Sequence, residues 1–486
     1  MPSVKPMTVA IFCGSKKPDS LEQYLRPLVD ELNNLIDKGI AVGNNDTTVK
    51  IKVRAIIADS PARSFIKGKT KTKQYKGSIK MQIPSWHTME NMGVLHCCKC
   101  TVVGYHHPIS RTMCFPDTKA PLRNDLDFRR RNYKEHQKEL TPLLHIHGLD
   151  MIKQIIIAEE LHLMHLGVER KLLHGWNYGL WGAEKWSDEV KEEISSELRR
   201  IVLPSEIHRK LRGLDDLKFW KGSEYSSFLH YAAPIILKGR ISDDAYSHFM
   251  LFHCAVKFLS SNTYKRQWET ADTFLEQFVT DYAQIYGEGY VSSNIHNLLH
   301  VTAEVRQFGP LSTLSVYIFE NALQVMKNML RSGWKNLEQV INRLSELDNF
   351  NASEPMKVLY EIEGHGDNVT LQMNDYILKK GNRDGWFLST EYEVIQFCSA
   401  AKVASSVVIT GKKLMGNKAT YNFPVSSKYL HTFECNVKDS STATININPS
   451  RIFCKLVAIP LGENGRTHFT PLIHTLPKVY SDSPME

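Results

Sequence analysis

The first sixty residues contain two short apolar runs and one amphipathic segment between them. The run Met7–Gly14 (MTVAIFCG) ends in glycine, and the run Val49–Asp59 (VKIKVRAIIAD) alternates before becoming continuously apolar. Both patterns are typical of strands that enter a buried sheet. From Ser20 to Asp37 the apolar residues recur at helical spacing, and Ser20 with Gln23 forms a capping-box pattern. The pattern predicts strand, helix and strand, with the two strands in one sheet and the helix packed on it.

Apolar residues recur with the spacing of a helix in the middle of the chain and with the spacing of a strand near its end. A loop-rich stretch runs to about residue 140, and apolar positions three and four apart then recur in segments between residues 149 and 347, beginning with 150–176. These segments should pack together as a large α-helical region. After LDNFNASEP, short alternating runs predict a small antiparallel sheet or barrel. The predicted domains are residues 1–140, 141–345 and 356–480.

Basic residues are concentrated in two places. The net charge is +8, and the segment Lys67–Lys80 (KGKTKTKQYKGSIK) holds six lysines and no acid. Three consecutive arginines follow at residues 129–131. Such clusters fit a polyanion such as DNA, and on charge alone a solvated basic loop is an equal alternative. The candidate DNA contacts are Lys67, Lys69, Lys71, Lys73, Lys76, Arg129, Arg130 and Arg131.

Cysteine spacing and hydropathy bear on the compartment. The chain has no run of about eighteen uncharged apolar residues, and its first residues have no apolar segment typical of a secretory signal. Its nine cysteines are irregularly spaced, with Cys97, Cys98 and Cys100 crowded together. This favours reduced thiols over a disulfide framework. We therefore expect a nuclear or cytoplasmic protein with no membrane partner.

Two sets of residues are candidate metal ligands. Asp59 stands at the carboxyl end of a predicted strand, where a carboxylate can serve two-metal phosphoryl transfer, although Asp before Ser-Pro also commonly begins a turn. Cys97-x-x-Cys100 offers two thiolates, and His162-x-x-His165 offers two imidazoles from one helical face. Together these four predict a zinc site, with loop cysteines and core histidines as the alternative. Further candidates leave the ligand set open: His96, Cys98, His106 and His107.

Several segments, in this order and with similar intervals, resemble the transposase domain of CACTA-type (CMC superfamily) mobile elements and their arthropod relatives. They are IFCGSKKP, ADSPAR, CCKCTVVG, LHLMHLGVERKLL, LPSEIHRKLRGLDDLKFWKGSEYSSFL, NIHNLLHVTAEVRQFGPL and YIFEN, between about residues 7 and 345. The resemblance implies an α+β protein with a truncated RNase H-like sheet and a large helical insertion, followed by a small β-rich C-terminal domain. Residues 1–140 would be a partial core with a Cys-containing loop, and residues 141–345 the helical insertion and the return to the core.

The resemblance also implies roles for single residues. Asp59 matches the second and Glu320 the third of three acids that hold Mg²⁺ or Mn²⁺ in this family, although by itself Glu320 is an ordinary helix-start residue. Cys97 and Cys100 match the family's Cys-x-x-Cys. Its partner falls in LHLMH, where Glu159 with His162 competes with His165 for the zinc.

The first of the three acids has no counterpart in this sequence. In the family it stands on a strand that precedes the first strand of this chain, and no acid precedes Asp19. The resemblance therefore implies a transposase-derived protein of cut-and-paste DNA transposition that is inactive in this form, whether as a fragment, a decayed copy or a repurposed one. The alternative is a non-catalytic DNA- or chromatin-binding or protein-interaction protein. We expect DNA as the partner, and a homo-oligomer is compatible with either function.

Overall fold

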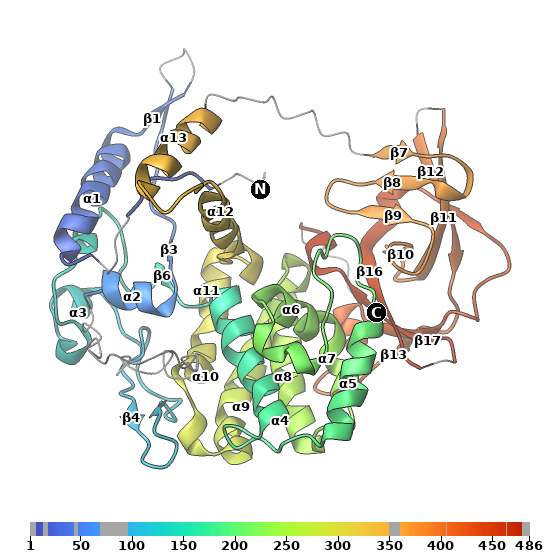
Figure 1. Cartoon of the computed structure of the whole chain (residues 1–486), viewed down its shortest axis with the longest axis horizontal. Coiled ribbons are helices and arrows are strands. Elements are labelled where there is room, and N and C mark those ends of the chain that lie inside the picture. Colours follow the sequence, from blue (N-terminus) through green and yellow to red (C-terminus); the bar gives the residue numbers. More distant parts are fainter. Residues whose placement is uncertain are drawn as a thin grey trace. The chain divides into compact units, whose positions relative to one another are not determined.

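The helices and strands of this α+β chain are divided between two units, each assembled from segments far apart in sequence (Figure 1). The computed structural model describes residues 6–12, 18–42, 47–68, 96–348, 360–404, 406–462 and 464–478. The first unit comprises residues 1–163, 288–304 and 314–354, and the second comprises residues 164–287, 305–313 and 355–486.

The helix predicted near the start of the chain is confirmed. Helix α1 spans Leu21–Lys38, and the Ser20 hydroxyl accepts a hydrogen bond from the Gln23 amide at 3.2 Å, which caps the helix. Gly39 ends the helix with a φ of 75°, a conformation that glycine adopts without strain. The buried face of α1 joins a core that contains Leu21, Leu25, Val29, Phe128, Leu143, Ile152 and Ile155.

A short parallel strand pair lies at the centre of the first unit. Strand β3 (Ile56–Ile57) pairs with β6 (Ile155–Ile156), and Ile56 lies opposite Ile155. The strand predicted over Val49–Asp59 is thus confirmed at its apolar end. The helix predicted from residue 150 is wrong at its start, because Ile155 and Ile156 of the apolar run form the buried strand β6 instead. A short, continuously apolar run fits either state, and its partner decides between them.

The prediction that Met7–Gly14 shares a sheet with Val49–Asp59 is wrong for the described residues. Residues 7–12 form no strand there, and Met7 is 85% exposed. Residues 13 and 14 lie outside the described part. Strand β1 (Ile40–Ala41) pairs with β2 (Thr48–Val49), while β3 pairs with β6. An apolar run becomes a strand only where a neighbour accepts and donates its backbone hydrogen bonds.

Between residues 60 and 140 the described elements are short and are separated by irregular segments, as the loop-rich composition predicts. They are α2 (Ser60–Ile66), β4 (Tyr105–His106), β5 (Met113–Cys114) and α3 (Asp125–Arg129). The first unit also contains three helices from the region predicted to be helical, which are α10 (Ser293–Asn297), α12 (Tyr317–Asn328) and α13 (Asn336–Asp348). Helix α11 (Val301–Phe308) follows α10 after a 3₁₀ turn at Leu298–His300.

The second unit contains most of the predicted helices. A π-helical segment, Glu160–Glu169, continues into α4 (Arg170–Tyr178). The helices that follow are α5 (Asp188–Arg200), α6 (Gly222–Ser227), α7 (Ala233–Ile236), α8 (Asp243–Leu259) and α9 (Trp268–Tyr286). Helix α8 is buried over most of its surface, which explains why its sequence is apolar on nearly every side.

The β-rich end of the chain is antiparallel, as its alternating pattern predicts. A three-stranded sheet has the order β7 (Glu361–Glu363), β8 (Thr370–Gln372) and β9 (Ile377–Lys379). An eight-stranded sheet has the order β13-β14-β17-β16-β10-β11-β12-β15, in which every pair is antiparallel. Its strands are β10 (Trp386–Ser389), β11 (Val394–Val403), β12 (Ser406–Lys413), β13 (Lys418–Ala419), β14 (Phe433–Asn436), β15 (Ile445–Ile447), β16 (Ile452–Pro460) and β17 (Arg466–Pro471).

A buried lysine ties the eight-stranded sheet to other parts of its unit. Lys455 on β16 has a fully buried side chain, and its Nζ lies 2.6 Å from Asp384 Oδ1 and 2.9 Å from Glu206 Oε2. Its Nζ also donates to the Ile377 carbonyl on β9 at 2.8 Å. Burial raises the pKa of Asp384, but hydrogen bonds from Lys455 and Ser205 outweigh it and hold that pKa below its usual value. The lysine thus links β16, β9 and the loop that follows α5.

We expect Lys455→Met to lower the free energy of unfolding by about 3–5 kcal/mol, because it leaves the buried carboxylate of Asp384 and the largely buried carboxylate of Glu206 without their cation. Urea unfolding of the full chain measures this change. The matched control is Lys478→Met. Lys478 pairs with Asp375 at 3.0 Å in the same unit with 70% of its side chain exposed, so the control should cost less than about 1 kcal/mol. Equal effects of the two substitutions would contradict the role given to Lys455.

Candidate metal centre

Two buried thiols are presented by one tight turn. Cys97 and Cys100 are 3% and 1% exposed. The Lys99 amide donates to Cys97 Sγ at 3.3 Å, and the Cys97 amide donates to the Val102 carbonyl at 3.3 Å. These bonds close the turn and direct both sulfur atoms to the same side.

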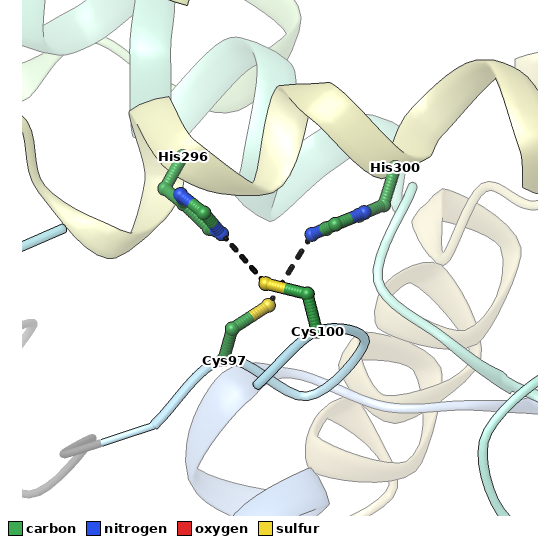
Figure 2. Close-up of side chains that lie close together, drawn as sticks. All are labelled: Cys97, Cys100, His296 and His300. Carbon is green, nitrogen blue, oxygen red and sulfur yellow. Dashed lines mark hydrogen bonds between the residues drawn. The ribbon is translucent and has the colours of Figure 1, made fainter. Parts of the chain in front are cut away.

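Two imidazoles face these thiols from a helical run. His296 on α10 and His300 at the end of the following 3₁₀ turn are four residues apart, and so lie on one face. His300 Nε2 lies 3.4 Å from Cys97 Sγ, and His296 Nε2 lies 3.2 Å from Cys100 Sγ. Figure 2 shows the four side chains pointing toward one another from the turn and the helix. Their four ligand atoms all lie within 4.8 Å of one another, and all four residues are buried.

This arrangement fits zinc. In a tetrahedral site with Zn–S and Zn–N bonds of usual length, sulfur and nitrogen are about 3.5 Å apart. The observed sulfur–nitrogen distances of 3.4 and 3.2 Å are within a few tenths of this value. Two cysteines and two histidines, with no position left for water or substrate, form the ligand set of a structural site.

The electrostatics of the thiol pair favour one thiolate. Burial raises the pKa of Cys97, but hydrogen bonds from Cys100, His296 and His300 outweigh it and hold that pKa well below its usual value. The pKa of Cys100 is raised by its hydrogen bond to Cys97 and by burial. Because zinc binds thiolates, a cation bound to both sulfurs would release the protons that the two thiols still carry.

The histidine partners predicted from the sequence are wrong. Cys97 and Cys100 meet His296 and His300, in place of His162 and His165 or Glu159. The signal that could have identified the true pair is its spacing. Three residues separate His296 from His300, as in many zinc sites, whereas only two separate His162 from His165.

The acidic candidates lie at the carboxyl edge of the parallel strands. Asp59 follows β3 and Glu159 follows β6, and parallel strands end at the same edge of a sheet. Asp59 Oδ1 accepts from the Ala62 amide at 2.7 Å and so caps α2, which is the turn-type role considered from the sequence. Glu320 is exposed in the first turn of α12. Metal binding by Asp59 and Glu320 stays a prediction.

Glu159 is buried and fully hydrogen-bonded at this edge. One of its oxygens accepts from the Leu161 amide at 2.7 Å and the Val316 amide at 3.2 Å. The other accepts from the His162 amide at 2.6 Å and from His162 Nδ1 at 2.7 Å. Burial works to lower the pKa of His162, but the bond and charge of Glu159 outweigh it. The charges of Asp59 and Glu320 add to this effect, so the pKa of His162 is raised. Three acids thus act on one imidazole.

The basic residues predicted to contact DNA fall into four groups. Lys67 is fully buried, with its Nζ 5.0 Å from the centre of the Phe128 ring, so its predicted surface role is wrong. Arg129 is bonded to Asp125 at 2.6 Å and to two backbone carbonyls. Arg130 and Arg131 are exposed. The remaining candidates lie outside the described residues: Lys69, Lys71, Lys73 and Lys76.

Comparison with known proteins adds one match. A family described as a domain of unknown function (DUF8592) matches residues 358–473, which include all strands of the eight-stranded sheet. A search of curated proteins found no match to the chain. Among the described helices, none is both long and apolar enough to cross a membrane.

We expect the purified chain to carry about one zinc ion, and His296→Ala to lose it, because the substitution removes one of four ligands. His162→Ala should keep the metal, since His162 bonds to Glu159 instead. Elemental analysis of the purified variants measures both. The opposite result, with zinc lost in His162→Ala and kept in His296→Ala, would restore the ligand set first predicted from the sequence.

We expect His162 to titrate above the usual histidine pKa of about 6.5. Glu159→Gln should lower its midpoint because it removes the bonded charge, and Glu320→Gln should lower it less. The stabilisation by the protonated pair is fully present below the unfolded pKa and is lost as the pH rises through the folded one. NMR titration of the imidazole measures these midpoints. A midpoint at or below the usual value would show that burial outweighs the acids.

Proposed function

We propose that the chain derives from a cut-and-paste DNA transposase and in its present form binds duplex DNA without cleaving it. The observation that carries this proposal is that the charges of Glu159, Asp59 and Glu320 together raise the pKa of His162, while Asp59 and Glu159 follow the paired strands β3 and β6. Asp59 and Glu320 are far apart in sequence, and these are the two acids that the resemblance to CACTA-type transposases assigns to metal binding. An RNase H-like origin would account for the action of both charges on one imidazole.

The zinc centre has a structural role in this proposal. Its ligands join the Cys97–Cys100 turn to the helical run that begins with α10, which are widely separated in sequence. Structural zinc contributes on the order of 10 kcal/mol or more in small sites of this type, so it can hold two such segments together. The centre offers no open position for a substrate. In this proposal any contact of the acids with DNA is therefore made at the carboxyl edge of β3 and β6, where Asp59 and Glu159 lie, which we call the acidic edge.

The acids at that edge are engaged in structural bonds, which argues against turnover. Glu159 accepts four hydrogen bonds, and one oxygen of Asp59 caps α2. Two-metal phosphoryl transfer needs carboxylates that are free to bridge ions about 3.5–4 Å apart. Glu320 is the most exposed of the three acids, and one accessible carboxylate supplies too few ligands for two ions.

A second function, metal-dependent strand cleavage, is favoured by the same three acids, whose charges all act on His162. In that case Mg²⁺ or Mn²⁺ would be held by Asp59 and Glu320 and would activate water or a strand 3′-hydroxyl as the nucleophile. When DNA binds, the hydrogen bond by which Asp59 caps α2 would then have to rearrange. Nicking of supercoiled DNA separates the two functions directly.

We expect no nicking of supercoiled plasmid by the full chain in Mg²⁺ or Mn²⁺. Conversion to the open-circular form is read on a gel, with Asp59→Ala and Glu320→Ala as controls for contaminating nuclease. Metal-dependent nicking that both substitutions abolish would establish the second function and overturn the first.

We expect duplex binding with a log–log salt slope of about −5, from about six phosphate contacts at roughly −0.9 each. Replacing both Arg130 and Arg131 by Gln should reduce the slope by about 2, because it removes two phosphate contacts. Fluorescence anisotropy at several salt concentrations measures the slope. The matched control is Arg343→Gln on α13, an arginine paired with Glu346 in the same unit, which should leave the slope unchanged. Absent or salt-insensitive binding would contradict the proposed function.

A further inference from the structure

One residue of a buried ion pair lies inside the metal-binding turn formed by Cys97–Cys100. Lys99 lies between the two cysteine ligands, and its Nζ is 2.5 Å from Glu304 Oε1, with only 7% and 5% of the two side chains exposed. The same Nζ donates to the Ile152 carbonyl at 2.6 Å. Burying two charges is favourable only where their geometry and their other bonds are well satisfied. The ion pair therefore requires a definite position of the turn.

The partner of this lysine lies one helical turn beyond a metal-binding histidine. Glu304 on α11 is four residues after His300, so the position of the helix sets that of its carboxylate. Glu304 Oε2 accepts from the Ile157 amide at 3.0 Å and from the Ala158 amide at 2.7 Å. These two amides belong to the two residues that connect β6 to Glu159. One carboxylate thus contacts both the metal-binding turn and the backbone that leads to the acidic edge.

The carbonyl side of the same edge is held by a separate residue. Arg63 on α2 is 7% exposed, and its Nη1 donates to the Ala58 carbonyl at 3.0 Å and to the Ile156 carbonyl at 2.9 Å. It therefore links the ends of β3 and β6 without touching Glu304. The Ile157 and Ala158 amides depend on Glu304, whereas the spacing of the two strands depends on Arg63.

We propose that Lys99 and Glu304 are positioning residues that couple metal binding at the Cys97–Cys100 turn to the placement of the Ile157–Glu159 backbone. The proposal rests on the structural zinc centre of the proposed function. A cation that binds both the turn and the helix fixes Lys99 relative to Glu304, and this orders the carboxylate that holds the two amides. When the cation is removed, the turn and helix can separate, and the ion pair and the amide bonds weaken together.

Coupling of this kind is reciprocal. If zinc stabilises the amide bonds through the ion pair, breaking the ion pair must weaken zinc binding by the same factor. Coupling energies of this type correspond to about 5- to 150-fold in an equilibrium constant. If Lys99 and Glu304 only stabilised the fold, substituting them would speed hydrogen exchange in the zinc-loaded and the zinc-free protein alike. The ratio of the two exchange rates would then stay unchanged.

Hydrogen exchange of the full chain, loaded with zinc or treated with a chelator, tests the proposal. In the wild type we expect zinc to slow exchange in peptides covering residues 152–163 by about 5- to 150-fold. In Lys99→Met and in Glu304→Gln the ratio of the exchange rates without and with zinc should fall to about 1. The affinity for zinc should fall by the same factor as this ratio. Glu304→Gln keeps an oxygen for the two amides, so it carries the test if Lys99→Met does not fold.

Two further variants exclude a general effect on stability. Asp125→Asn is the matched control, because Asp125 pairs with Arg129 at 2.6 Å and accepts from the Met151 amide at 2.8 Å in the same unit. It has the same type of bond to a backbone amide near β6, and both of these bonds go to residues outside the metal-binding turn, so the variant should keep the full response to zinc. Lys99→Arg keeps the cation and should restore most of the response.

The outcomes separate the inference from the function on which it rests. If zinc binds stoichiometrically and the exchange of residues 152–163 does not respond, the coupling is wrong and the metal centre stands. If Lys99→Met and Glu304→Gln keep the full response, the coupling does not pass through these residues and the inference is overturned. If the wild-type chain binds no zinc, the structural metal centre fails, and the inference fails with it.

Discussion

The first unit depends on the burial of two thiols and two imidazoles against one another. These groups lose their contacts with water when Cys97, Cys100, His296 and His300 come together, and a cation shared by all four is the strongest compensation available to them. The constraint joins a loop to a helix distant in sequence. A cation bound by all four residues would therefore act as a covalent-like tie in a unit whose described paired strands are only two residues long, too short to provide such a tie by hydrogen bonding.

The geometry of the acidic edge depends on this tie and on a few buried charged residues. Glu304 reaches the backbone before Glu159, and Arg63 reaches the carbonyls at the ends of β3 and β6. Charged groups buried in this way are costly when misplaced, so each of them selects one arrangement of the chain. Carboxylates that are fixed by several hydrogen bonds keep one position, so they are poorly suited to exchanging ligands during a reaction.

The second unit is built on a different principle. Its helices and its antiparallel sheets bury large apolar surfaces, and buried polar contacts such as that of Lys455 with Glu206 and Asp384 join elements that are distant in sequence. The family match at residues 358–473 falls on its strands and assigns them no activity. The segments that carry the resemblance to transposases lie before this region, between about residues 7 and 345.

The sequence by itself determined the elements whose signals are local. Helix α1 with its Ser20 cap, the helices of the middle region and the antiparallel end follow from apolar spacing and turn residues, which neighbouring positions encode directly. The Cys-x-x-Cys turn was also identified from its local spacing. Tertiary structure alone decided which run becomes a strand and which histidines meet the thiols. Residues 7–12 lack a strand partner, and residues 155–156 acquire one. Pairing across more than a hundred residues depends on packing that no local pattern records, so His296 and His300 were identified as the partners of Cys97 and Cys100 only when the chain was folded.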